Sequence, residues 1–224
     1  MTTITQPNKV RSPGAQADLL VRPLTEHDLP AAGEIYIAAN PKSLLTSFGS
    51  KQVLHYLSWQ LQARHMAAAT AAEVDGELAG ILLLVKNNDL PGYLKQNTAF
   101  LLRSFLRHGA VLFTPLFRAR ATQCIRCLVN PPKSWKGQPG TVRVLCIAVH
   151  PKFQGNGIGG KLLRAAEELA YSRGHNRAEL TVKTTNVSAI RFYERSGWEK
   201  LTVDGQWTGA MQKHFSPERE KGRS

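Results

Sequence analysis

A glycine-rich segment about two thirds of the way along the chain has the residue types of an anion-binding loop. It contains, in order, Gln154, Gly155, Asn156, Gly157, Ile158, Gly159 and Gly160. The apolar run 142–149 precedes it and a helical pattern over 161–170 follows. A strand that turns through glycines into a helix presents free backbone N–H groups at the positive end of the helix dipole. The segment is therefore predicted to hold a phosphate or diphosphate group.

Two familiar glycine-loop signatures do not account for this segment. A Walker phosphate loop ends in Gly-Lys-Ser/Thr, whereas Lys161 is followed here by Leu162. The spacing of a dinucleotide fingerprint is met by Gly155, Gly157 and Gly160, and Glu179 stands about where a ribose ligand would be expected. However, too little chain follows the loop to complete a doubly wound sheet, so this interpretation is set aside.

A second motif lies after the next predicted strand, 178–184, in a short helical segment that a glycine closes. The two motifs together resemble the GNAT superfamily of acetyl-CoA-dependent N-acetyltransferases. The cofactor-loop pattern Gln/Arg-x-x-Gly-x-Gly/Ala is matched by Gln154, Gly157 and Gly159. The later pattern Asn-x-x-Ala-x-x-x-Tyr-x-x-x-Gly-Phe is matched by Asn186, Ala189, Tyr193 and Gly197, with Trp198 in the place of the Phe.

The resemblance implies a fold and an activity. The expected fold is α/β, with a mixed, mostly antiparallel central sheet that is flanked by helices and splayed between its fourth and fifth strands. The expected reaction moves an acetyl group from acetyl-CoA, the co-substrate, to a primary amine. No metal is expected to take part.

The resemblance also implies roles for particular residues. The amides of Gly155, Asn156, Gly157, Ile158, Gly159 and Gly160 would bind the diphosphate of acetyl-CoA, with Gln154 fixing the loop. Ile147 and Val149 would pair their backbone with the pantetheine arm, and Asn186 would hold that arm from the neighbouring strand end. Tyr193 would protonate the leaving thiolate, for which a phenol of ordinary pKa, about 10, is a reasonable match.

Each side-chain role has a structural alternative. Tyr193 could fill core space, Asn186 could cap the following helix, and Gln154 could be an ordinary loop residue. The general base stays open between Glu179, His150 and none. Thr181 occupies the position where many members of the superfamily carry a carboxylate, and Cys146 is expected to be a buried small residue.

The first half of the chain predicts the elements that begin such a fold. A strand is expected over 19–24, followed by a helix that Thr25 and Asp28 cap and that runs to about Ala39. A loop is expected over 43–50 and a second helix over 53–61. Two strands should then pair as a hairpin around Asp75 and Gly76.

An insertion over about 87–140 separates the third expected strand from the fourth. It carries eight Lys or Arg residues and one acid, Asp89, within a chain of net charge +13. Apolar residues recur among these cations at helical spacing: Leu94, Leu101, Phe105 and Leu112. A basic apolar helix of this kind is typical of a structural cap on the sheet, of peripheral contact with an anionic membrane, or of a homodimer surface. Cys124 and Cys127 form a lone C-x-x-C pair, too few ligands for a zinc site.

The remaining expectations concern organisation and partners. Residues 1–17 read as a disordered lead-in, 18–215 as one domain and 216–224 as a flexible tail. Composition and three cysteines favour a cytoplasmic protein, with peripheral contact at the inner face of the membrane as an alternative, and give no specific nucleic-acid signal. The excess of Lys and Arg over Asp and Glu favours an acidic acceptor, which could be a small molecule, an amino sugar or a peptide. The alternative is a non-catalytic acyl-CoA-binding regulator or membrane-recruited adaptor with the same fold.

Overall fold

A computed structural model describes residues 18–62, 64–86, 90–100, 103, 139–203 and 205–215 of the chain. The expected lead-in 1–17 and tail 216–224 lie outside these residues. So do Leu101, Phe105, Leu112, Cys124 and Cys127 of the insertion, and with them most of its expected amphipathic helix.

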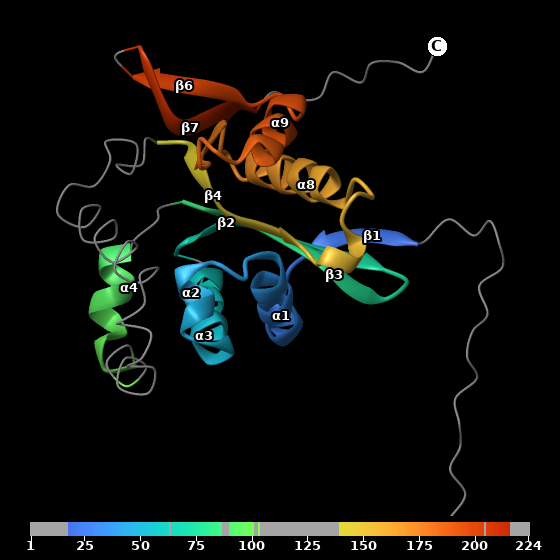
Figure 1. Cartoon of the computed structure of the whole chain (residues 1–224), viewed down its shortest axis with the longest axis vertical. Helices are drawn as coiled ribbons and strands as arrows, with labels where there is room; N and C mark the ends of the chain where they lie inside the picture. Colours follow the sequence, from blue (N-terminus) through green and yellow to red (C-terminus); the bar gives the residue numbers. More distant parts are fainter. Residues whose placement is uncertain are drawn as a thin grey trace, which may run out of the picture.

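One seven-stranded sheet forms the centre of the molecule, and all but one of its strand pairs are antiparallel, as expected (Figure 1). Across the sheet its strands run in the order β1 (Leu19–Pro23), β2 (Met66–Val74), β3 (Glu77–Val85), β4 (Thr141–Val149), β5 (Arg177–Thr181), β7 (Gln206–His214) and β6 (Glu199–Val203). The hairpin of β2 and β3 turns at Asp75 and Gly76, whose φ angles of 52° and 80° suit a tight two-residue turn.

The sheet opens between β4 and β5, the one parallel pair. Pairing joins Thr141, Val142 and Arg143 to Arg177, Ala178 and Glu179 and ends there. Strand β4 continues to Val149 along β3, so its segment 144–149 runs on without a β5 partner. The splay expected between the fourth and fifth strands is therefore present.

A bulge bends β4 within this open segment. Cys146 lies opposite Leu83 and Val144 lies opposite Leu84, which leaves Leu145 as an extra residue on β4. As a result, Leu145 and Cys146 both pack on the same side of the sheet, while Val144 and Ile147 pack on the other. A bulge re-aims the side chains of a strand at the point where its pairing changes.

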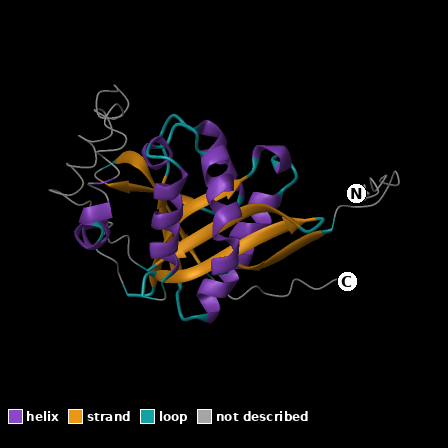
Figure 2. Cartoon of the chain, turned by 90° about the horizontal axis from the view of Figure 1, so that it is seen from below, coloured by secondary structure: helices purple, strands orange, loops and turns teal. Residues whose placement is uncertain are grey.

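Helices cover the two faces of the sheet (Figure 1). On one face lie α1 (Leu29–Ala39), α2 (Leu44–Ser47) and α3 (Ser50–Leu61), and Figure 2 shows helices crossing the strands on that side. On the other face lie α8 (Ile158–Ser172) and α9 (Val187–Arg195). Apolar residues of α8, such as Leu162, Leu163 and Ala166, are fully buried against the sheet, because they recur on one side of the helix.

A network of charged hydrogen bonds joins β1 to the helix that follows it. The Thr25 amide donates to Oδ2 of Asp28 (2.8 Å) at the short helix η1 (Glu26–Asp28), which leads into α1. Arg22 of β1 donates to both oxygens of Asp28, at 2.7 and 2.8 Å, and also to Glu73 of β2. The expected cap is present, and it also joins β1, β2 and α1.

Helix α4 (Leu90–Gln96) belongs to the insertion and packs against α3. The Nε2 group of Gln52 donates to the Tyr93 hydroxyl (3.1 Å), and His55 hydrogen-bonds Asn97 (2.6 Å). The rings of Tyr56 and Tyr93 meet edge to face at 5.1 Å. Polar and aromatic groups therefore fix this part of the insertion on the first half of the fold. No helix among the described residues has the length and apolarity to cross a membrane.

Candidate acetyl-transfer site

The glycine-rich loop is built by side chains that turn back onto its own backbone. The short helix η3 (Pro151–Phe153) begins after His150, whose Nδ1 accepts from the Lys152 amide (3.3 Å). Gln154 donates from Nε2 to the Val149 carbonyl (2.9 Å), and Asn156 donates to the Phe153 carbonyl (3.2 Å). Gln154 thus fixes the loop to the end of β4.

Glycines leave the entrance to α8 open. Gly155 and Gly157 have φ angles of 85° and 72°, in the left-handed region that favours glycine. A methyl group added at Gly155, Gly157 or Gly160 would meet no other atom within 4 Å. The amides of Gly160 and Lys161 donate to the Gly157 carbonyl, while those of Ile158 and Gly159 precede the hydrogen bonds of the helix. The result is an exposed cradle of N–H groups.

Strand β4 and helix α9 meet beside this cradle. A Cβ at Gly159 would lie 3.5 Å from the Phe192 ring and 3.7 Å from Cδ1 of Ile147. The end of the cradle, the open segment of β4 and α9 are therefore neighbours. Three of the predicted elements come together at one place, although they are up to 45 residues apart in the sequence.

Tyr193 is 8% exposed and packs in the core on the α8 face. Its ring lies 5.1 Å from Phe192 and 5.6 Å from Trp198. Burial raises the pKa of Tyr193 above its ordinary value, and the Cys146 thiol adds to the increase. The phenol therefore differs from the one of ordinary pKa expected from the sequence. It keeps its proton at neutral pH and can therefore donate it.

Cys146 lies at the bulge of β4, next to the splay. Burial raises the pKa of its thiol to about 12, so it is no nucleophile at neutral pH. The same thiol acts on the pKa of Tyr193 from α9 and on those of Tyr36 and Tyr56 from α1 and α3. Tyr193 packs on one face of the sheet, whereas Tyr36 and Tyr56 belong to helices on the other face. Sequence reasoning did not find Tyr36 and Tyr56, because nothing in their spacing indicates which strand they face.

Glu179, one of the candidate bases, is held in an ion cluster. Its carboxylate pairs with Arg143 of β4 (3.2 Å) and with Arg177 of β5, and its side chain is 8% exposed. Burial lowers the pKa of Arg143, which Glu179 opposes. Both carboxylate oxygens thus bind guanidinium groups and hold β4 to β5 where the strands are still paired.

The two remaining candidate side chains, Asn186 and His150, each hydrogen-bond a nearby backbone amide. Asn186 caps α9 by accepting from the Ala189 amide (3.2 Å), as the structural alternative predicted. His150 begins η3 at the cradle end of β4, and its Nδ1 is occupied by the Lys152 amide. Neither contact tests a role in cofactor binding or proton transfer. Among the described residues, His, Cys, Asp and Glu form no group of three or more that could hold a metal ion.

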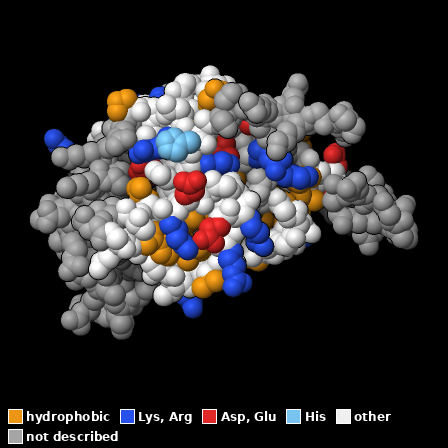
Figure 3. Space-filling model, turned by 90° about the horizontal axis from the view of Figure 1, so that it is seen from above, with side chains coloured by type: hydrophobic (Ala, Val, Ile, Leu, Met, Phe, Trp, Pro, Cys, Tyr) orange, Lys and Arg blue, Asp and Glu red, His pale blue; other side chains and the backbone are white. Residues whose placement is uncertain are grey.

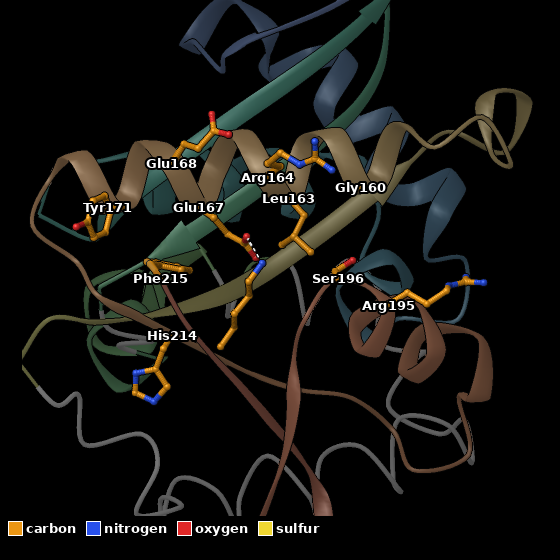
Figure 4. A pocket seen from close by; sticks show the side chains of 11 residues that line it. Gly160, Leu163, Arg164, Glu167, Glu168, Tyr171, Arg195, Ser196, His214 and Phe215 are labelled. Carbon is orange, nitrogen blue, oxygen red and sulfur yellow. Dashed lines mark hydrogen bonds and ion pairs between the residues drawn. The ribbon is translucent and has the colours of Figure 1, made fainter. Parts of the chain in front are cut away.

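A pocket of about 550 Å³ lies between α8, the end of α9 and the end of β7 (Figure 4). Its polar centre is Glu167, which accepts from Lys213 (2.6 Å) and from the Trp198 indole (3.1 Å). Burial raises the pKa of Glu167, and these two donors oppose that effect. The pocket shares only Gly160 with the cradle, and His214 in its lining pairs with Arg177, where β4 and β5 are still joined. It is therefore separate from the splay.

Positive and negative side chains both lie on the surface of the molecule that is seen from above. Figure 3 shows Lys and Arg side chains interspersed with Asp and Glu on the face seen from above. The exposed ion pair of Lys200 with Glu194 (2.9 Å) is one example.

Comparison with known proteins agrees with this arrangement. Residues 123–198 match the model of the acetyltransferase (GNAT) family. An uncharacterized N-acetyltransferase of Methanocaldococcus jannaschii is 44% identical over 61 residues, which make up 27% of this chain and 27% of that protein. The chain thus matches only about a quarter of the length of this relative.

Solved structures extend the likeness over the whole domain. The ribosomal-protein-S18-alanine N-acetyltransferase of Escherichia coli superposes with a TM-score of 0.54 at 17% identity, covering 91% of this chain and 98% of that one. The PaiA N-acetyltransferase of Thermoplasma acidophilum, solved in complex with coenzyme A, gives 0.53 at 15% identity, covering 88% and 99%. At such identities the agreement concerns the fold. With both motifs and the splayed sheet in place, the chain has the fold of the GNAT acetyltransferases, and residues 123–198 match the model of that family.

Proposed function

We propose that this protein is an N-acetyltransferase that moves the acetyl group of acetyl-CoA to a primary amine. The observation that carries the proposal is the splay. Strand β4 parts from β5 after Arg143, beside the cradle at the start of α8 and on the face where α9 carries a buried phenol.

The cofactor would enter along this opening. The amides at the start of α8 suit its diphosphate, since the end of the helix is positive and no side chain covers it. The unpaired edge of β4 near Ile147 supplies backbone groups for the amides of the pantetheine arm. Asn186 would contribute its side-chain amide nitrogen as a donor, since its oxygen already caps α9.

The reaction requires one bond to form and one to break. The neutral amine attacks the thioester carbonyl, the carbon–nitrogen bond forms, and the carbon–sulfur bond then breaks. The nitrogen loses one proton to solvent, and solvent returns a proton to any phenolate formed when the thiolate is protonated. Tyr193 would donate a proton, or a hydrogen bond, to the departing thiolate. Because burial raises the pKa of Tyr193, its phenol still carries its proton at neutral pH and has it available for the thiolate.

The body of the acceptor is proposed to be acidic. The chain carries a net charge of +13, which attracts anionic molecules over long distances. A small molecule, an amino sugar or an acidic peptide would fit. A screen in which polyamines are acetylated better than anionic amines would contradict this part of the proposal.

A non-catalytic regulator or adaptor that binds acyl-CoA is the second candidate, favoured by the engagement of Glu179 in its ion cluster. Thiol release from acetyl-CoA with a panel of primary amines separates the two. An enzyme releases thiol in proportion to acetylated amine, whereas an adaptor binds acetyl-CoA without turnover.

The same assay tests Tyr193. We expect Tyr193→Phe to lower kcat by about 100-fold, the usual range for a lost acid catalyst, with little change in the Kd of acetyl-CoA. Tyr171→Phe on α8 is the matched control, since that ring is 40% exposed and lines the separate pocket. Full activity of Tyr193→Phe would remove the phenol from the mechanism.

A further inference from the structure

The turn from α8 to β5 is a basic, polar segment at the surface. Residues 171–177 read Tyr-Ser-Arg-Gly-His-Asn-Arg and contain no acid. Arg173 donates from Nη1 to the Ala67 carbonyl near the start of β2 (2.7 Å). The Asn176 carbonyl accepts from the Phe215 amide just past the end of β7 (2.8 Å). The turn therefore lies at the end of the sheet where β2 begins and β7 ends.

Charge is unevenly divided between the two ends of the sheet. The acidic side chains at the end where β2 turns into β3 are Asp18, Glu73, Asp75 and Glu77. At the other end Arg64 precedes β2, Lys86 follows β3 and Arg177 begins β5. The insertion over about 87–140 joins β3 to β4 at this second end, and its eight Lys or Arg residues against one Asp give it a net charge of +7. Positive charge thus gathers beside the turn.

The acids at this end of the sheet do not neutralise that charge. Glu179 is bound by two arginines, and Glu167 is bound by Lys213. The other described acids nearby are Glu168 on α8 and Glu199 on β6. Within the part of the chain that the structure describes, no acid forms an ion pair with Arg173, so its charge is available to an anion from outside.

His175 stands in the middle of the turn, with its ring half-buried. Burial lowers its pKa, and the positive charges of Lys86 and Arg173 lower it further, so the imidazole is neutral at pH 7. Its Nδ1 is buried without a hydrogen-bond partner among the described residues, and so is Nε of Arg177. Unpaired buried polar atoms are costly, and a polar ligand at this turn would supply a partner.

An aromatic end of the separate pocket lies beside this turn. Tyr171, His214 and Phe215 line the pocket, and Figure 4 shows their side chains together at one end of it. The Tyr171 ring is 40% exposed. The other large apolar side chains that are this exposed among the described residues are Leu20 on β1 and Val187 at the start of α9. One open ring beside cations suits a flat ligand with an anionic group, rather than the apolar interior of a membrane.

We infer that this end of the molecule binds single-stranded nucleic acid, with a base stacked on Tyr171 and the neighbouring phosphates beside Arg173. We name the residues of this contact the turn surface: Tyr171, Arg173, His175, His214 and Phe215. Bases of every kind stack on aromatic rings, and phosphates bind cations without sequence preference. A duplex would not fit, because its bases are already stacked inside the helix. The contact joins two segments far apart in the chain, so no motif marks it in the sequence.

This inference goes beyond acetyl transfer and does not depend on it. Helix α8 carries the glycine cradle at its start and the turn surface at its end. Its 15 residues rise by about 22 Å between the two. A bound strand would therefore leave the cradle free for acetyl-CoA.

Fluorescence anisotropy on the full chain measures the binding of labelled oligomers about 12 nucleotides long. Oligouridine and oligothymidine are the single-stranded probes, since RNA and DNA share the chemistry that the turn surface recognises. A DNA duplex of the same length and polyglutamate of the same charge are the controls. We expect a Kd on the order of 10 μM for a single strand at about 50 mM salt, and binding about tenfold weaker for both controls. The tighter of the two single strands identifies RNA or DNA as the ligand.

Two substitutions of one residue test the stacking. Tyr171→Ala removes the ring, and we expect it to raise the Kd of the single strand about tenfold while the Kd of polyglutamate stays the same. Tyr171→Phe keeps the ring and should bind the single strand as the parent protein does.

A matched pair of charge variants tests the phosphate contact. Arg173→Gln should lower the slope of log K against log salt for the single strand by about 0.7, the value for one phosphate. Arg191→Gln removes the same charge from an exposed position on α9 and should leave the slope unchanged. Thermal unfolding verifies that all four variants are folded.

Several outcomes would overturn the inference. If the duplex or polyglutamate binds as tightly as the single strand, charge alone explains the binding. If Tyr171→Ala keeps full affinity for the single strand, the base does not lie on this ring. Binding to vesicles of phosphatidylcholine and phosphatidylserine in equal parts, without binding to oligonucleotides, would assign this end to a membrane. Each of these results leaves the proposed acetyl transfer untouched, because thiol release from acetyl-CoA is measured separately.

Discussion

A methyl group added at Gly160 would have a different effect from one added at Gly155 or Gly157. The two earlier glycines have positive φ angles, so any substitution at them strains the loop itself. Gly160 lies inside the first turn of α8 without a positive φ, and open space surrounds its Cβ position. It therefore allows the binding surface to be changed without changing the fold.

We expect Gly160→Ala to keep or slightly raise the stability of the protein, by up to about 1 kcal/mol, because alanine favours a helix over glycine. The same methyl group would project where the diphosphate is proposed to lie, and should weaken acetyl-CoA binding by about tenfold or more. Calorimetry and thermal unfolding on one preparation measure both effects. Unchanged affinity in a stable variant would place the diphosphate elsewhere.

At the scale of elements, the link between β1, β2 and α1 depends on ionised groups. The Arg22 guanidinium beside Asp28 holds the pKa of that carboxyl well below its usual range. A carboxyl with a lowered pKa stabilises the folded state above its unfolded pKa, about 3.9, and this contribution is lost as pH falls toward the folded value.

Asp28→Asn should therefore lower the free energy of unfolding at pH 7 by about 1–3 kcal/mol, the range of hydrogen bonds to charged groups. The difference between the two proteins should persist down to about pH 5 and shrink below pH 4. Urea unfolding at several pH values measures it. If the difference in free energy of unfolding between the two proteins does not depend on pH, the stabilisation by the cap does not depend on the negative charge of Asp28.

Local signals in the sequence predicted most of these elements. The Asp75-Gly76 turn, the Thr25 cap and the glycine entrance to α8 are each set by a few adjacent residues, and each is present. The expected loop over 43–50 instead contains α2, which begins where Ser43 accepts from the Thr46 amide.

Contacts between distant residues could not be predicted in this way. The pairing of Glu179 with Arg143, 36 residues away, turns a candidate base into part of an ion cluster. The packing of α4 on α3 joins Gln52 to Tyr93, and no periodicity reports such a contact. The bulge at Leu145 likewise depends on the register between two strands that lie more than 50 residues apart.

At the scale of the whole molecule, charge governs the approach of an anionic cofactor. The chain has 29 Lys or Arg residues against 16 Asp or Glu. Such a field raises association rates, and salt screens it over a distance that falls from about 10 Å at 0.1 M to about 3 Å at 1 M.

We expect the association rate of acetyl-CoA to fall by about tenfold between these two salt concentrations, with a much smaller change in its dissociation rate. Stopped-flow fluorescence follows both rates through the four tryptophans. If salt instead changes mainly the dissociation rate, direct ion pairs rather than the overall field dominate binding.

The central claim is that acetyl-CoA lies in the splay, with its diphosphate on the cradle. Hydrogen–deuterium exchange with and without acetyl-CoA tests it most directly, because it reports on individual segments of the backbone. The account predicts slower exchange at 155–161 and along 144–149, with no change at the end of β7 that borders the separate pocket. Protection confined to that pocket, or protection nowhere along the chain, would contradict it.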